Sequence, residues 1–258
     1  MTQMLNHRAG MTERQARFMN MLESMCENAG ELPERVQSQI AEIMAQAPEA
    51  LNMSPRDNND PSINLRKLIQ HFMLWDLEER YGDMQFPDTT FRLPFYEHSR
   101  EIAGVRNSQV ISFNPMHPLV REYDFGVCIG WPFDSWEAFF YQLAHESVHL
   151  LNPKVAPVGM LRTSTLDEGV AVRYAEEMLE RYFPDVNPYS VGSPAGMPNA
   201  YDEAWRAARK IPDKALRQVR ETFGGFGDIT DAARFKELTA QWLTSAEAEP
   251  LSSDFHYS

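Results

Sequence analysis

Cysteine is scarce in this chain of 258 residues, and basic side chains are outnumbered by acidic ones. The two cysteines, Cys26 and Cys128, stand outside any paired-cysteine motif, which argues against a disulfide framework and against a zinc–thiolate site. The 24 lysines and arginines against 37 aspartates and glutamates give a net charge of −13. Nucleic-acid binding requires clustered positive charge, so we expect no nucleic-acid partner.

Long apolar runs are also missing. A membrane-spanning helix needs about 20 consecutive, mostly apolar residues, and the sequence contains no such run. Residues 1–13 are polar and contain no apolar segment of the kind that a signal peptide requires. We therefore expect a cytoplasmic protein without a membrane partner, in which both cysteines are reduced.

A polar run separates the helical beginning of the chain from the rest. Helical periodicity over 11–29 and 33–46 predicts a helical hairpin, which we regard as the candidate surface for a protein partner. The polar residues of 52–62 predict a linker with a boundary near residue 60. The chain is therefore expected to contain an N-terminal helical segment over 1–60, a main domain over 61–245 and a flexible tail over 246–258.

The pattern of apolar and turn-forming residues changes between residues 84 and 131. Short β-like runs at 89–93, 109–113 and 125–129 are separated there by Gly, Asn and Pro. They predict a small sheet in an otherwise mainly helical fold of the α+β class. Residues 109–113 are our candidate for an edge strand. An inner strand fits about equally well, because Val110 and Ile111 interrupt the alternation of apolar and polar residues.

The strongest chemical signal is His145-Glu146-Ser147-Val148-His149. Asp134 and Glu137 predict a capping box at the start of a helix over 135–151. Residues four apart on a helix differ by about 40° in direction, so both imidazoles can reach one metal ion while Glu146 stays beside it. A solvated helix face is the alternative for the histidines. The opposite face is expected to pack in the core through Trp136, Phe139, Phe140, Leu143, Ser147, Leu150 and Leu151.

Glu168 follows His149 after eighteen residues, on a second helix predicted over 166–183 with Thr165 or Ser164 as its cap. It falls in line with the apolar stripe of that helix, and a buried carboxylate needs a partner or a metal ion. The alternative is that Glu168 caps its own helix together with Thr165. His, His and Glu leave a fourth tetrahedral position open for water, which is typical of catalytic zinc.

These residues resemble the gluzincin metallopeptidases, in which His-Glu-x-x-His on one helix is completed by a Glu on the next. The gap of eighteen residues and the Glu-Gly-x-Ala context are closest to the membrane-alanyl-type aminopeptidases. The resemblance covers residues 134–183 and implies a zincin-like fold, with a small sheet before the active-site helix and a helical C-terminal part. It also implies that His145, His149 and Glu168 bind zinc and that Glu146 is the general base.

Two departures limit the resemblance. The chain has no Gly-x-Met-x-Asn segment upstream of the motif, the element by which those aminopeptidases grip a free N-terminus, so aminopeptidase specificity is not implied. The related metzincin pattern requires Gly at 152 and His at 155, whereas the chain has Asn152 and Val155. That branch is excluded.

In the implied mechanism, zinc lowers the pKa of its bound water towards about 7, and Glu146 accepts the proton as the water attacks an amide carbonyl. The developing oxyanion needs a further donor, for which Tyr is the usual side chain in this group. Tyr174, Tyr189 and Tyr201 follow the ligands, and we favour Tyr201. Packing of this ring on a neighbouring helix is the alternative.

Several other residues near the motif are candidates for supporting roles. Asp167 and Arg173 would orient the ligands or line the rim, with exposed salt bridges as the alternative. The loop over 184–198, rich in Pro and Gly, is a candidate lid or a simple connection to helices expected over 199–211, 213–222 and 230–244. The aromatic group Trp131, Phe133, Trp136, Phe139 and Phe140 is expected in the core rather than in a substrate pocket.

The sequence therefore predicts a zinc-dependent peptidase that cleaves an internal bond of a peptide or protein substrate. A binding or regulatory protein with a zincin fold, and a zinc hydrolase of a non-peptide amide, are the alternatives. The presence of Glu146 favours an enzyme. A site that had lost its activity could lose the general base and still hold the metal. Glu97, Glu101 or Asp124 would restore aminopeptidase behaviour if one of them bound a substrate α-amine.

Overall fold

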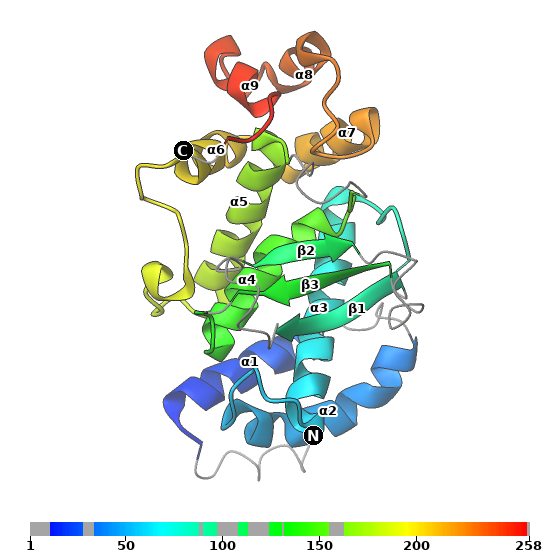
Figure 1. Ribbon diagram of the computed structural model, residues 1–258, viewed down its shortest axis with the longest axis vertical. Helices are drawn as coiled ribbons and strands as arrows, with labels where there is room; N and C mark the ends of the chain where they lie inside the picture. The colour runs from blue at the N-terminus through cyan, green and yellow to red at the C-terminus, as the bar shows by residue number, and fades with distance from the viewer. Residues whose placement is uncertain are drawn as a thin grey trace.

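The computed structural model describes residues 11–27, 34–87, 90–96, 108–112, 124–130, 132–154 and 163–256. Over these residues the protein is mainly helical with one small sheet, so the α+β class predicted from the sequence is confirmed (Figure 1). None of the helices within these ranges combines the length and the apolar character that a membrane span requires.

The sheet consists of β1 (Phe91–Tyr96), β2 (Gln109–Ser112) and β3 (Phe125–Ile129) in the order β1-β3-β2. The central strand β3 is buried along its whole length, with β1 parallel to it and β2 antiparallel. Among the described strands β2 therefore lies at an edge, as predicted for 109–113, of which Phe113 lies outside the described residues.

The strand β1 extends further than expected, because it runs through Pro94 to Tyr96 instead of ending at residue 93. Proline cannot donate to a strand ladder and is tolerated at sheet edges and irregularities. β1 offers both, since it has β3 as its one neighbour among the described strands and its register shifts between Arg92 and Phe95.

Helices α1 (Glu13–Glu27), α2 (Glu34–Leu51) and α3 (Asp60–Tyr81) precede the sheet. α2 continues past the predicted end at residue 46, although Pro48 removes one backbone donor near its end. The polar linker is shorter than predicted because Asn59 caps α3, accepting the backbone N–H of Ser62, and Pro61 occupies the first turn.

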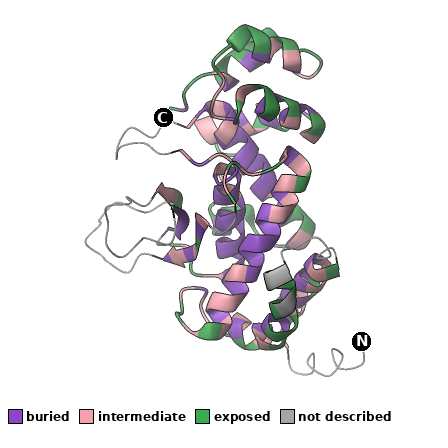
Figure 2. Ribbon diagram, turned by 90° about the vertical axis from the view of Figure 1, so that its right-hand side faces the viewer, coloured by how far each residue is buried: buried purple, intermediate pink, exposed green. Residues whose placement is uncertain are grey.

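The buried residues form one cluster that reaches from α1 to the C-terminal helices (Figure 2). Phe18 of α1 joins it, with its ring centroid 4.6 Å from that of Phe183 and 6.3 Å from that of Trp136. The division of the chain into domains near residue 60 stays a prediction. Helix α4 (Trp136–His149) lies between the sheet and helix α5 (Thr165–Tyr182), with α3 packed beside it (Figure 1).

The C-terminal part is helical, as expected, but is ordered further along the chain. It contains α6 (Ala200–Ala208), α7 (Asp213–Phe223), α8 (Ala232–Thr239) and α9 (Ser245–Leu251). We predicted a flexible tail over 246–258, whereas α9 begins with a capping box between Thr244 and Glu247, and Phe255 beyond it is buried. The Thr-x-x-Glu pattern at 244–247 is typical of such a helix start.

Candidate metal centre

Helix α4 begins one residue later than expected and has a different cap. The side chain of Ser135 accepts the backbone N–H of Ala138 at 3.1 Å, so the predicted capping box of Asp134 and Glu137 is wrong. Glu137 instead forms a salt bridge with Arg14 of α1, which ties the N-terminal helix to the start of α4. Ser135 fulfils the same requirement, since its oxygen satisfies an N–H that the first turn leaves unpaired.

The predicted apolar stripe of α4 is buried in full. The remainder of the helix is more enclosed than an amphipathic pattern suggests, because Tyr141, Gln142 and Val148 are buried as well. His145 and His149 keep 14% and 12% of their side-chain surface, which leaves the two imidazoles reachable but largely out of water. This environment differs from the solvated helix face considered as their alternative.

Helix α5 starts at Thr165 with Ser164 as its cap, one of the two caps predicted. The hydroxyl oxygen of Ser164 accepts the N–H of Asp167 at 3.1 Å. Glu168 is 3% exposed and turns towards α4, so it is not the capping residue of its own helix. The next residue, Gly169, faces α6 so closely that an added Cβ would lie 2.6 Å from the carbonyl oxygen of Ala204.

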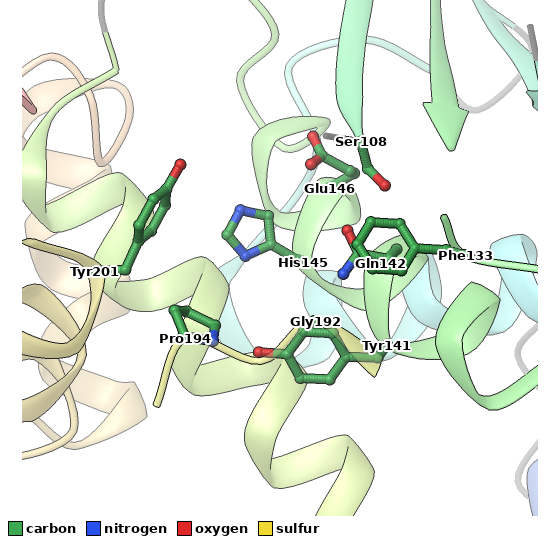
Figure 3. A pocket seen from close by; sticks show the side chains of 9 residues that line it. All are labelled: Ser108, Phe133, Tyr141, Gln142, His145, Glu146, Gly192, Pro194 and Tyr201. Carbon is green, nitrogen blue, oxygen red and sulfur yellow. The ribbon is translucent and has the colours of Figure 1, made fainter. Parts of the chain in front are cut away.

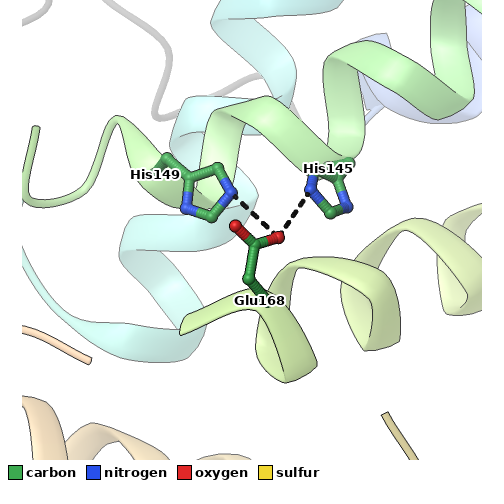
Figure 4. A group of neighbouring side chains, drawn as sticks. All are labelled: His145, His149 and Glu168. Atoms are coloured by element: carbon green, nitrogen blue, oxygen red, sulfur yellow. Dashed lines mark ion pairs between the residues drawn. The ribbon is translucent and has the colours of Figure 1, made fainter. Parts of the chain in front are cut away.

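The two helices bring His145, His149 and Glu168 together (Figure 4). Oε2 of Glu168 lies 3.3 Å from Nε2 of His145 and 3.7 Å from Nε2 of His149. One potential ligand atom from each residue lies within 4.8 Å of the other two. Within the described part of the chain, this is the group of His, Cys, Asp and Glu side chains with the spacing of a metal site.

These residues fit a small divalent cation. Ligands about 2.1 Å from a tetrahedral zinc ion lie about 3.4 Å apart, which is close to the two observed nitrogen–oxygen separations. Oε2 of Glu168 is buried, yet it makes no hydrogen bond of normal geometry with the described residues. A buried carboxylate oxygen without a hydrogen bond is costly unless a charge compensates it. The donor set of two imidazoles and one carboxylate is one that zinc accepts.

The protonation of the cluster follows from its opposed charges. Burial by itself would lower the pKa of His149, but the carboxylates of Asp167 and Glu168 raise it to about 10. Burial would raise the pKa of Glu168, but His149 and His145 hold it at about 2. Without a metal ion, the cluster therefore keeps a proton on His149 through neutral pH, and a cation has to displace that proton.

Glu146 lies beside His145, His149 and Glu168, but its carboxylate is directed towards β2. It is 5% exposed, and its carboxylate accepts a hydrogen bond from the backbone N–H of Val110 in β2. On an edge strand, every second residue directs its N–H away from the neighbouring strand, which explains why Val110 can reach α4. Burial raises the pKa of Glu146, and the rings of His145 and His149 partly oppose this rise.

A cavity of about 130 Å³ opens beside His145 and Glu146 (Figure 3). The loop over 184–198 forms one wall, where the amide of Gln142 donates to the carbonyl of Val191 at 2.9 Å and Ser193 donates to Glu176. These bonds hold the loop against α4 and α5. The cavity is lined by Ser108, Phe133, Tyr141, Gln142, His145, Glu146, Gly192, Pro194 and Tyr201.

Of the three tyrosines considered, Tyr201 lies at the site. Its ring centroid is 6.4 Å from that of His145, across the cavity from Phe133 and Gln142 (Figure 3). Tyr174 is fully buried and its hydroxyl donates to the carbonyl of Met73, while Tyr189 is 55% exposed and does not line the cavity.

The other candidates divide between the site and the scaffold. Asp167 contacts His149, whereas Arg173 pairs with Glu177 and Asp213 and belongs to the scaffold. Asp124 is exposed and does not line the cavity, and Glu97 and Glu101 lie outside the described residues. Trp136, Phe139 and Phe140 are core residues as expected, Phe133 lines the cavity, and Trp131 lies outside the described residues.

Gly192 and Pro194 belong to the candidate lid over 184–198, whereas the sequence does not predict that Ser108, Tyr141 and Gln142 line the cavity. Nothing in their local pattern separates them from other helix and loop residues. Comparison of the chain with protein-family models, with curated proteins and with solved structures gives no match.

Proposed function

We propose that the protein is a zinc-dependent hydrolase that cleaves a peptide bond, with His145, His149 and Glu168 as ligands and Glu146 as general base. The observation that carries the proposal is the meeting of three ligand atoms around a buried carboxylate oxygen, with a separate buried carboxylate at the rim of a cavity. A purely structural cluster has no need of Glu146 in that position.

Each residue of the proposed site has a distinct role. The two imidazoles and Glu168 hold the ion, and Asp167 fixes the orientation of His149 through its other ring nitrogen. When bound, zinc supplies Lewis acidity, which lowers the pKa of a coordinated water and polarises a carbonyl group. The open side of the cluster towards the cavity is where a scissile bond would lie.

Glu146 takes the proton of the attacking water and later transfers it to the leaving amine. The raised pKa of this carboxyl makes it a stronger base than an exposed glutamate, and the N–H of Val110 holds it in one orientation. The hydroxyl of Tyr201 is our candidate donor to the developing oxyanion.

A peptide is the substrate class that the surroundings favour. The strand β2 presents an edge next to Glu146, and an extended peptide can add to such an edge through main-chain hydrogen bonds. A sheet edge beside a helix that carries the ligands is the arrangement expected of a zincin-like fold, which we propose for residues 90–183.

The test compares the metal content and the hydrolytic activity of three proteins purified without chelator. We expect about one zinc per chain in the parent, an inactive Glu146→Gln variant that retains the metal, and a Glu168→Ala variant that loses both. Loss of zinc from Glu146→Gln, or full retention by Glu168→Ala, would contradict these roles.

The same measurements separate the proposed enzyme from its alternatives. A zincin-like binding protein would hold zinc, and zinc would raise its melting temperature, but no peptide library would be cleaved. A hydrolase of non-peptide amides would turn over small acylated amines while leaving peptides intact. A parent protein that binds no stoichiometric transition metal would rule out all three.

A further inference from the structure

The chain segment after α9 returns to the start of α5 and pairs with it. The N–H of Thr165 donates to the carbonyl of Ser253 at 3.0 Å, and the N–H of Phe255 donates to the carbonyl of Thr163 at 2.9 Å. Ser164 and Asp254 form the antiparallel bridge between them. The segment therefore lies along the residues that lead directly into Asp167 and Glu168.

This pairing places the ring of Phe255 against Tyr201. Phe255 is 7% exposed, and its ring centroid lies 4.6 Å from that of Tyr201, with the planes at 54°. The Tyr201 ring also contacts that of His145, at 6.4 Å between centroids. The phenol thus contacts both the imidazole of a proposed ligand and a phenyl ring from the C-terminal segment.

The backbone of Tyr201 is fixed independently. Asn199 caps α6 by accepting the N–H of Asp202, and the carboxylate of Asp202 accepts the N–H of Gly196 at 2.7 Å. Gly169 allows α6 to approach α5 so closely that a Cβ at this position would meet the Ala204 carbonyl. With the backbone held, Tyr201 can still rotate about its two side-chain torsions. A ring packed against the phenol restricts these rotations.

We infer that Phe255 is a positioning residue that holds the Tyr201 phenol beside the metal centre, an inference that rests on the proposed function. Tyr201 donates its hydrogen bond at the far end of a long side chain, so a small rotation moves the hydroxyl by an ångström or more. A displacement of about 1 Å at a reacting group can reduce a rate by about a hundredfold. Phe255 prevents that rotation by filling the space behind the ring.

A double-mutant cycle on the zinc-loaded full chain tests this role. We expect Phe255→Ala to lower kcat by about tenfold in the parent, with little change in KM or zinc content. In a Tyr201→Phe background, which lacks the hydroxyl and is expected to lose roughly a hundredfold in kcat, the same substitution should change kcat by less than about twofold. An equal loss in both backgrounds would overturn the inference.

A second readout requires neither zinc nor turnover. In the metal-free protein we expect a nuclear Overhauser contact between the ring protons of Tyr201 and His145, which weakens severalfold in Phe255→Ala. Phe235→Leu is the control, because Phe235 is a fully buried phenylalanine of another element, α8. It should lower the melting temperature without changing the Tyr201–His145 contact.

The outcomes separate the two proposals. A parent protein that hydrolyses nothing refutes the proposed function, and the ring contact still decides whether Phe255 positions Tyr201. An unchanged contact in Phe255→Ala refutes the positioning role, whatever the activity. If Phe255→Ala does not fold, Phe255→Leu keeps most of the buried apolar volume and takes its place in both measurements.

Discussion

Asp167 and Glu168, adjacent in the first turn of α5, contact opposite nitrogens of the same imidazole. Oδ2 of Asp167 lies 3.0 Å from Nδ1 of His149, while Oε2 of Glu168 lies 3.7 Å from its Nε2. With Nδ1–H donating to Asp167, it is the Nε2 proton that a cation displaces, and Nε2 then offers its lone pair to the centre of the cluster. The Ser164 cap holds the N–H of Asp167 and thereby fixes the turn that supplies both carboxylates.

The first prediction concerns this contact. Asp167→Asn removes the charge that fixes the tautomer and orientation of His149, so zinc affinity should fall by about 10- to 100-fold. Competition with a chromophoric chelator measures the change. Asp228→Asn is the control, since Asp228 pairs with Lys154 at 3.0 Å and touches no proposed ligand. Equal affinities in the two variants would contradict a role for Asp167.

The second prediction concerns the pH dependence of the metal-free protein. The pKa of His149 is raised from 6.5 to about 10, so its stabilising contribution is complete below pH 6.5 and is lost as the pH rises through 10. The pKa of Glu168 is lowered from 4.5 to about 2, so its contribution is complete above pH 4.5 and is lost as the pH falls through 2. Chemical denaturation should therefore show a falling free energy of unfolding between pH 6.5 and 10.

The affinity of the protein for zinc should instead rise over the same pH interval. The cation displaces the His149 proton, so zinc affinity rises with pH and binding at pH 7 releases about one proton. Calorimetry in buffers of different ionisation enthalpy measures the number released. Proton release near zero at pH 7 would show that His149 is neutral before the metal binds.

The third prediction concerns the cavity wall at Gly192. Its φ of +83° is strained for any other residue, and an added Cβ would lie 2.5 Å from the Phe133 ring. Gly192→Ala should lower kcat/KM by about tenfold or more, the scale of one methylene group in a substrate pocket. Gly224→Ala is the control, because it has a φ of +86° with nothing within 4 Å. It should cost only the stability that the positive φ demands and leave kcat/KM unchanged.

The fourth prediction concerns the substrate. The sequence has no Gly-x-Met-x-Asn segment, and the described cavity lining contains no carboxylate besides Glu146 to bind a free α-amine. We expect the zinc-loaded protein to cleave N-acetylated and free peptides of one sequence at the same internal bond. Cleavage restricted to the first residue of the free peptides would instead indicate an aminopeptidase, with the zinc chemistry unaffected.

Most of the cluster is visible in the sequence because its spacing is local. The i and i+4 positions of His145 and His149 are fixed by the helical repeat, and the apolar stripes of α4 and α5 determine which faces turn inwards. The predicted cap of α4 was wrong by one residue, because Asp134 and Ser135 both suit a helix start. Glu137, which a capping box would use, instead pairs with Arg14, far away in the chain.

The remaining features were decided by tertiary structure. The N–H of Val110 reaches Glu146 only because β2 lies at the edge of the sheet, and Phe255 meets Tyr201 only because the chain after α9 pairs with the start of α5. These contacts join residues 36 and 54 positions apart, and a periodic pattern carries no information over such separations. Local propensity thus specified the faces that carry His145, His149 and Glu168, whereas long-range packing specified the groups that surround them.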